Sequence, residues 1–386
     1  MARNLRTSID VGTSTTRVVI AEKEKGSDDF TVVGVGSAPT RGMRHGYVTS
    51  PDTVALSIKK AVNEAAKALN GEKIRRAQFL VGAVTLSSAS TIGTAVISKA
   101  DNEVTALDVE KSIKESEAHV DLTNRRVLRI IPQAYRLDGK EIHGTPVGMK
   151  GIKLETRVFY VTALTQHMDD LEAAALLAGI DVIDLIPAPL ASAETAMTER
   201  QKTVGGAVVT IGSDTVSIGV FEDNVPIGVQ VFPFGSNDIT NDIALAFKIS
   251  LEEAENIKIG ASTNLPKKKV DDVIEARLDD IFELLDNYLK KLKRSELLPA
   301  GIVFVGAGAL LPSLEIVAKS SLNLPARVGV AEDHGKGGAK VRDPGFLPVY
   351  GASMLGIHNP YAFSDGSHKN DSFKEAVKRF FDQFRP

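Results

Sequence analysis

The sequence predicts an α/β protein made of two related lobes with a cleft between them. A buried strand, a polar turn containing a glycine and a second strand occupy residues 8–20, and the same pattern returns at residues 208–220. The chain between the two patterns is long enough for a complete lobe. Further strands and helices follow each pattern in a similar order, which indicates internal duplication. Strands that alternate with helices are typical of the α/β class.

The composition is that of an ordinary globular protein and excludes several classes of function. The 386 residues are 43% hydrophobic and 25% charged, enough for two or three domains with apolar cores. The formal net charge is -3, aromatic residues make up 5% and tryptophan is absent, so nucleic acid is not an expected partner. The absence of cysteine excludes disulfides and thiolate metal sites. The polar residues 1–6 do not predict a secretory signal.

The first lobe is predicted to begin with a β-meander and a helix. Strands are expected at 7–10, 17–22 and 30–36. Ser50 and Pro51 form a typical helix start, and apolar residues with helical spacing follow to residue 69. A buried strand is expected at 78–84. We assign residues 1–84 and 162–198 to the core of this lobe, where the second part holds a helix at 165–178, a strand at 181–186 and a small-residue helix at 190–198.

Residues 85–161 differ from the flanking segments in their pattern of expected strands and helices, and they are predicted to form an inserted α+β subdomain. Strands are expected at 91–97, 126–137 and 155–161, and an amphipathic helix at 105–118.

We assign residues 199–237 and 300–357 to the core of the second lobe and residues 238–299 to a helical subdomain of that lobe. Its expected elements are the strand pair around Gly212, strands at 228–234 and 301–305, and helices at 239–246, 251–259, 270–292, 311–321 and 351–357.

The first glycine turn carries the groups that a polyphosphate needs. Gly12 lets backbone N–H donors approach a ligand closely, and a carboxylate at Asp10 can hold Mg²⁺ directly or through water. A plain hairpin with an Asx-turn would give the same pattern, so the motif alone leaves both interpretations open. The hydroxyls of this turn belong to Thr13, Ser14, Thr15 and Thr16.

Three further elements support a nucleotide site. A second turn of the same kind contains Gly212, Ser213, Asp214 and Thr215, and the pair is more specific than either turn alone. The strand at 301–305 runs into Gly306, Ala307, Gly308 and Ala309, where the backbone can lie flat against a base or ribose, although such turns are common in α/β proteins. Glu255 and Lys258 share one helix face and can bind ribose and adenine, or form only a solvated ion pair.

The chain ends in a predicted amphipathic helix at 372–386, after a linker at 358–371. The apolar side chains fall on one face, and basic side chains flank them. This combination favours a helix that lies in the interface of an anionic membrane, while a helix docked on the protein itself or on a partner remains the alternative. The apolar residues are Phe373, Val377, Phe380, Phe381 and Phe384, and the basic ones are Lys374, Lys378, Arg379 and Arg385.

The repeated strand–turn–strand pattern and the late glycine turn resemble the actin-like ATPase superfamily, which has a duplicated ribonuclease H-like fold. Within it, essentially the whole chain resembles the bacterial FtsA family of cell-division proteins. The supporting segments are 41–46, 146–149, 187–193, 234–243 and 348–356. The size and position of the insertion at 85–161 distinguish FtsA from filament proteins such as MreB. The pilus protein PilM shares the insertion-type plan.

The resemblance implies a site, partners and a location. It implies ATP and Mg²⁺ between the lobes, with Asp10 on the metal and Gly235 added to the nucleotide contacts. It also implies head-to-tail protofilaments through the inserted subdomain, and docking of the FtsZ C-terminal tail around residues 238–299. The expected location is the cytoplasmic face of the membrane at the division site, among anionic lipids and other division proteins.

Two departures from the superfamily pattern predict tight ATP binding with slow or no hydrolysis. Actin-like ATPases usually place an aspartate where this chain has Thr210, and often an acidic or amide residue near Ala188. Loss of such groups weakens the transition state and not ground-state binding. Asp10 and Asp214 remain the candidate catalytic carboxylates.

Two other functions are alternatives to this one. A PilM-like peptide-binding scaffold would lack the terminal anchor, and a sugar or acetate kinase would need a carboxylate base in the cleft.

Overall fold

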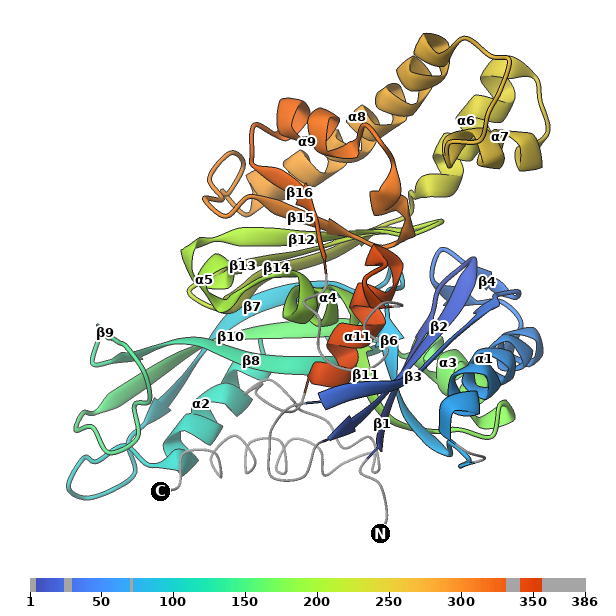
Figure 1. Ribbon diagram of the computed structural model, residues 1–386. Helices are drawn as coiled ribbons and strands as arrows, with labels where there is room; N and C mark the ends of the chain where they lie inside the picture. Colours follow the sequence, from blue (N-terminus) through green and yellow to red (C-terminus); the bar gives the residue numbers. More distant parts are fainter. Residues whose placement is uncertain (1–4, 24–29, 70–71, 331–340, 356–386) are drawn as a thin grey trace.

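The computed structural model describes residues 5–23, 30–69, 72–330 and 341–355. The first lobe is built on a five-stranded sheet with the strand order β11-β6-β1-β2-β3 (Figure 1). The strands β1, β2 and β3 form the predicted antiparallel meander, and β6 and β11 run parallel to β1. The bounds are β1 Leu5–Val11, β2 Thr15–Lys23, β3 Phe30–Pro39, β6 Arg76–Val81 and β11 Asp181–Pro187.

The second lobe repeats this plan inside a larger, nine-stranded sheet. Its order is β16-β15-β12-β13-β14-β7-β10-β8-β9, and the first five strands again form an antiparallel meander followed by two parallel strands. The predicted duplication is therefore confirmed in strand order and direction. The bounds are β12 Gly206–Ile211, β13 Val216–Glu222, β14 Val225–Phe232, β15 Ile302–Val305 and β16 Ala326–Val328.

Helices cover the outer faces of both lobes. In the first lobe, α1 (Pro51–Ala66) packs on β3 and α3 (Thr165–Leu177) packs beside α1. In the second lobe, α8 (Lys267–Lys291) buries a stripe of apolar residues from Val270 to Leu289, at the helical spacing that the sequence predicts. The other helices of this lobe are α5 Glu199–Val204, α6 Ser236–Phe247, α7 Leu251–Lys258 and α9 Leu314–Leu322.

Two helices of small residues lie in the middle of the molecule, α4 (Ala188–Ala196) and α11 (Leu347–Met354) (Figure 1). Each follows the last strand of its lobe, and the two pack against each other. They cross so closely that a Cβ atom at Gly351 would overlap the Ala191 carbonyl oxygen. The small residues are therefore required by this crossing, which joins the lobes.

The inserted segment forms β7 (Ser87–Val96), β10 (Lys153–Leu164), β8 (Arg125–Leu137) and β9 (Lys140–Ile142), with α2 (Ala106–Glu117) packed on them. Its sheet continues that of the second lobe, because Ser87 on β7 pairs with Gln230 on β14. On the other side, Arg129 of β8 forms an ion pair of 2.6 Å with Asp184 of β11. The insertion thus contacts both lobes.

Several predicted boundaries differ from the structure. The strand β6 ends at Val81 and not at residue 84, because the chain turns there toward the cleft. The glycine turn after β15 continues as a 3-10 turn, Ala307–Leu310, so that α9 begins only at Leu314. The helix α11 begins at Leu347, four residues before the predicted start at Gly351. The elements β9, β16 and α5 were not predicted, because they are only three to six residues long.

The predicted linker at 358–371 and the predicted amphipathic helix at 372–386 lie outside the described residues. Within the described ranges, none of the helices combines the length and the apolar character that a membrane span requires.

Candidate functional site

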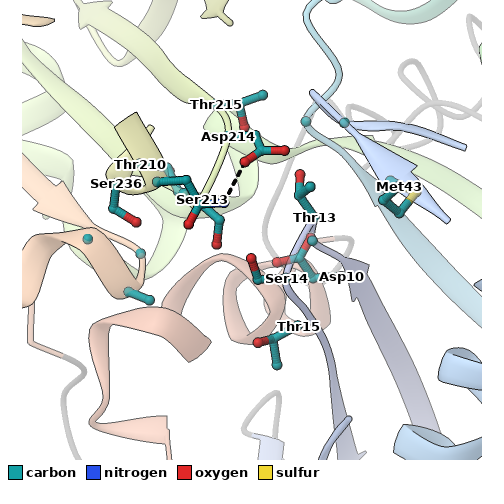
Figure 2. A pocket seen from close by; sticks show the side chains of 18 of the residues that line it. Asp10, Thr13, Ser14, Thr15, Met43, Thr210, Ser213, Asp214, Thr215 and Ser236 are labelled. Atoms are coloured by element: carbon teal, nitrogen blue, oxygen red, sulfur yellow. Dashed lines mark hydrogen bonds between the residues drawn. The ribbon is translucent and has the colours of Figure 1, made fainter. Parts of the chain in front are cut away.

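A cavity of about 950 Å³ lies between the lobes, and both glycine turns line it. Figure 2 shows Asp10, Thr13 and Ser14 on one side and Ser213, Asp214 and Thr215 on the other. The two hairpins therefore face each other, as the sequence analysis expected. The predicted site residues in the wall are Asp10, Gly12, Thr13, Ser14, Thr15, Gly212, Ser213, Asp214, Thr215, Glu255, Lys258, Gly306, Ala307 and Gly308. Thr16, Gly235 and Ala309 are not part of the wall.

The first turn joins β1 to β2 and is held by its own backbone. A Cβ atom on Gly12 would lie 2.8 Å from the Thr15 carbonyl oxygen, so a side chain there would force the turn open. The Thr40 N–H at the end of the meander donates to the Ser14 carbonyl oxygen at 3.0 Å. Thr16 is buried, and its hydroxyl lies 2.8 Å from that of Thr40. Thr16 therefore braces the turn from behind.

The second turn is held by the start of α6. The N–H groups of Ser236 and Asn237 donate to the carbonyl oxygens of Gly212 and Ser213 at 2.9 and 2.8 Å. The Asn237 amide also donates to the Asp214 carboxylate at 2.7 Å. The helix α6 thus binds two carbonyl oxygens of the turn and the Asp214 side chain.

Gly235 explains how α6 can come so close to the second turn. A Cβ atom on Gly235 would overlap the Ser213 backbone. Gly235 thus supports the turn from outside the cavity.

Asp10 is the carboxylate of the first turn. Its burial raises the pKa of Asp10, while the Arg17 guanidinium opposite it on β2 lowers that pKa by a smaller amount. A cation at this place would favour the ionised carboxylate. Among the described residues, no group of three or more His, Asp or Glu side chains gathers to hold a metal by itself. A metal ion on Asp10 would therefore need the oxygen atoms of a ligand and water, which is the usual way Mg²⁺ is bound.

Lys258 organises the wall between α6 and α7. Its side chain is 5% exposed, and its ammonium group lies 2.7 Å from Glu255, 3.0 Å from the Thr240 hydroxyl and 3.1 Å from the Ser236 carbonyl oxygen. All three protons of the ammonium group thus have acceptors. The Glu255 side chain is 44% exposed and keeps part of its carboxylate at the cavity.

Apolar side chains that the sequence analysis missed line the same part of the cavity. Leu251, Ile259 and Leu310 are 60%, 69% and 62% exposed, which is high for residues of this size. Exposed apolar groups beside hydrogen-bonding groups are typical of ligand sites. Leu251 begins the otherwise polar helix α7 and Ile259 directly follows it, while Leu310 ends a turn of small residues, so the residue pattern did not mark these side chains as exposed.

Away from the first glycine turn and Arg17, the first-lobe wall of the cavity is largely apolar. His167 lies among these apolar residues, and its Nδ1 lies 3.0 Å from the Thr85 hydroxyl. Burial lowers the pKa of His167. The apolar lining residues of this wall are Met43, Val48, Leu80, Met168 and Leu171.

The two positions where this chain lacks the usual polar or acidic residue of the superfamily lie in the cavity wall. Thr210 and Ala188 both line the cavity. The Thr210 hydroxyl lies 3.0 Å from that of Ser192 on α4. Neither position offers a carboxylate.

Comparison with protein families decides between the relatives considered above. The family model described as cell division protein FtsA matches residues 207–351, and the model described as the SHS2 domain inserted in FtsA matches residues 85–162. The chain belongs to the FtsA family. The match to the SHS2 domain covers the segment from β7 to β10, which is where the sequence analysis placed the insertion.

Curated relatives agree over most of the length of this FtsA-family chain. The cell division protein FtsA of Pseudomonas aeruginosa is 29% identical, over 96% of this chain and 94% of that protein. The FtsA protein of Bacillus subtilis is 26% identical, over 92% of this chain and 84% of that protein.

Solved structures show the actin-like fold. A type IV pilus PilM–PilN complex has a TM-score of 0.69 at 17% identity, covering 92% of this chain and 99% of that chain. An MreB protein of Spiroplasma citri bound to ADP has a TM-score of 0.50 at 12% identity, covering 92% of this chain and 96% of that chain.

Proposed function

We propose that this FtsA-family protein binds ATP with Mg²⁺ between its lobes, assembles into filaments and tethers FtsZ filaments to the cytoplasmic face of the cell membrane at the division site. The observation that carries the proposal is the pair of glycine turns on opposite walls of a cavity of about 950 Å³. Two such turns from duplicated lobes can hold a polyphosphate from both sides.

Different groups of the chain bind different parts of the nucleotide. Backbone N–H groups and hydroxyls of the two turns bind the phosphates. Glu255, oriented by Lys258, binds the ribose or the base, and Leu251, Ile259 and Leu310 cover the base with apolar surface. The backbone of the turn at Gly306 lies beside the base or the ribose. Asp10 holds Mg²⁺, directly or through water, and the metal ion supplies positive charge against the phosphates.

Hydrolysis is expected to be slow, so that ATP acts mainly as a structural ligand. Thr210 and Ala188 cannot accept a proton from water as a carboxylate could. Asp214 is the other carboxylate beside the second turn, and the Asn237 amide already binds it.

Filament formation and FtsZ binding are assigned to surfaces away from the cavity. The inserted subdomain contacts the next subunit, and exposed apolar side chains at its end, Val96, Leu107 and Ile152, suit such a contact. The FtsZ tail docks on the subdomain at 238–299, which contains α7, α8 and all but the first two residues of α6.

Membrane attachment is assigned to the amphipathic segment at 372–386, with Phe373, Val377, Phe380, Phe381 and Phe384 among the acyl chains. One short helix binds a membrane weakly, but a filament presents many helices, so that each further contact is intramolecular. Filament formation and membrane binding therefore reinforce each other.

Flotation of vesicles tests this proposal. Vesicles containing anionic lipid, FtsZ, ATP and Mg²⁺ are mixed with the full chain or with a chain that ends at Asp371. We expect the full chain to carry FtsZ to the vesicles and the truncated chain to leave FtsZ in solution. Equal amounts of FtsZ on the vesicles with both forms would contradict the tether. Replacing the anionic lipid by neutral lipid separates electrostatic attraction from apolar insertion.

A further inference from the structure

A small hairpin of the first lobe reaches the second glycine turn. It consists of β4 (Met43–Arg44) and β5 (Tyr47–Val48), with His45 and Gly46 at its tip. The Nδ1 atom of His45 lies 3.2 Å from the backbone carbonyl oxygen of Asp214. Since a carbonyl can only accept, His45 donates from Nδ1–H. The bond joins the first lobe to the turn proposed to hold phosphates.

The hairpin is fixed to the first lobe on its other side. Gly46 lies so close to the segment that follows β6 that a Cβ atom there would be 2.6 Å from the Ala83 Cα atom. The Tyr47 ring packs on the His167 ring of α3, with the ring centres 4.0 Å apart. Met43, Gly46 and Val48 line the cavity. The hairpin therefore moves with the first lobe, while Asp214 is held to α6 of the second lobe.

The hydrogen bond also fixes one peptide unit of the turn. In a trans peptide the C=O and the following N–H point in opposite directions. When His45 holds the Asp214 carbonyl, the orientation of the Thr215 N–H is set as well. A free peptide unit would rotate more easily, and the turn would be less well organised for a bound phosphate.

We propose that His45 is a latch between the lobes that slows the release of a bound nucleoside triphosphate. This inference rests on the proposed nucleotide binding. His45 is a positioning residue: it contacts the backbone of the turn, and it acts on the ligand through that turn. Opening of the cleft separates the hairpin from Asp214, so the bond must break before the nucleotide leaves. A neutral hydrogen bond of this kind corresponds to a change of about threefold to tenfold in the rate of release.

Two substitutions of equal size replace the donor by another donor or by a charged acceptor, and the measurement without nucleotide below removes repulsion between that charge and the phosphates. His45 has a φ of 47°, a left-handed conformation that Asn and Asp both tolerate. His45→Asn keeps a donor close to the position of Nδ1, whereas His45→Asp places an acceptor against the Asp214 carbonyl. Arg44→Ala changes an exposed neighbour on the same hairpin and serves as the control.

The measurement is the release of a fluorescent ATP analogue, chased with excess ATP and Mg²⁺ in stopped flow. We expect His45→Asp to release the analogue about threefold to tenfold faster than the unmodified chain. His45→Asn and Arg44→Ala should stay within about twofold. Equal rates for His45→Asp and His45→Asn would overturn the latch. Thermal unfolding of all variants shows whether a faster release reflects a damaged fold.

A second measurement separates the latch from the proposed function. Hydrogen exchange of residues 43–48 is recorded without nucleotide. Faster exchange in His45→Asp than in His45→Asn supports the link between the lobes even if no ATP analogue binds, in which case the proposed function fails alone. Equal exchange in the two variants, with or without nucleotide binding, means that His45 does not join the lobes.

Discussion

The hydroxyls of Ser192 and Thr210 lie 3.0 Å apart and join the interlobe helix α4 to the strand that leads into the second glycine turn. Ser192 already donates its proton to the Ala188 carbonyl oxygen at 2.9 Å. Since a hydroxyl has one proton, Thr210 is the donor in the bond between them. The proton of Thr210 is therefore directed at Ser192 and is not available to position a water molecule in the cavity.

Thr210→Asp should increase ATP hydrolysis. A carboxylate at this place can accept a proton from water, and general-base assistance typically contributes a factor of about 10² or more. Steady-state phosphate release measures the effect, with Thr210→Val as the control that removes the hydroxyl and adds no base. A Thr210→Asp variant that binds ATP and still hydrolyses it no faster than the Val variant would contradict this assignment.

Asp10→Asn should stabilise the nucleotide-free protein at neutral pH. The pKa of Asp10 is raised in the folded state, so the folded protein binds this proton more readily than the unfolded chain does. Stability due to Asp10 is therefore lost as the pH rises from the ordinary aspartate pKa of about 3.9 through the raised value. Urea unfolding from pH 8 down to pH 4 should show an advantage of the Asn variant that shrinks as the pH falls toward the ordinary aspartate pKa. An Asn variant less stable at pH 8 would refute this reading of Asp10.

The ion pair between Arg129 and Asp184 should be important for attaching the insertion to the first lobe. The two side chains are 4% and 13% exposed. Removing one partner of a buried pair leaves the other charge without compensation and typically costs about 3 kcal/mol. Arg129→Met and Asp184→Asn should each approach this loss in chemical unfolding, and the double variant should lose clearly less than the sum. Strict additivity would mean that the two charges do not interact.

Gly351→Ala should destabilise the crossing of α4 and α11. The added Cβ atom would overlap the Ala191 carbonyl oxygen, and overpacking of this kind costs about 1–3 kcal/mol. The control is Gly82→Ala, whose Cβ atom would lie 3.6 Å from that of Ala188, an ordinary contact distance. Unfolding curves of the two variants without nucleotide are compared. Equal stability of the two would show that the helices can separate at little cost.

The sequence was sufficient to predict the elements whose residues follow a strong periodic pattern. The apolar stripe of α8 from Val270 to Leu289 and the two strand pairs around Gly12 and Gly212 are found where they were expected. The short strand β16, Ala326–Val328, was missed because three residues carry no readable pattern. Its place is set by pairing with β15, a long-range contact that local sequence does not contain.

The candidate site was predictable only where backbone chemistry demands special residues. Glycine and hydroxyl residues marked the two turns, because close approach of a ligand restricts the choice there. Leu310 and His45 could not be found in this way. Their roles depend on where the chain folds them, Leu310 into the cavity wall and His45 against Asp214, and the residue types themselves are common elsewhere.

Calorimetric titration of the folded full chain with ATP in the presence of Mg²⁺ shows whether the two facing turns hold a triphosphate. We expect one ATP per chain and a clearly weaker affinity when Mg²⁺ is omitted. We also expect loss of binding in Gly12→Val, whose side chain would force the first turn open. Absence of any heat of binding from a chain that shows a cooperative unfolding transition would contradict the claim.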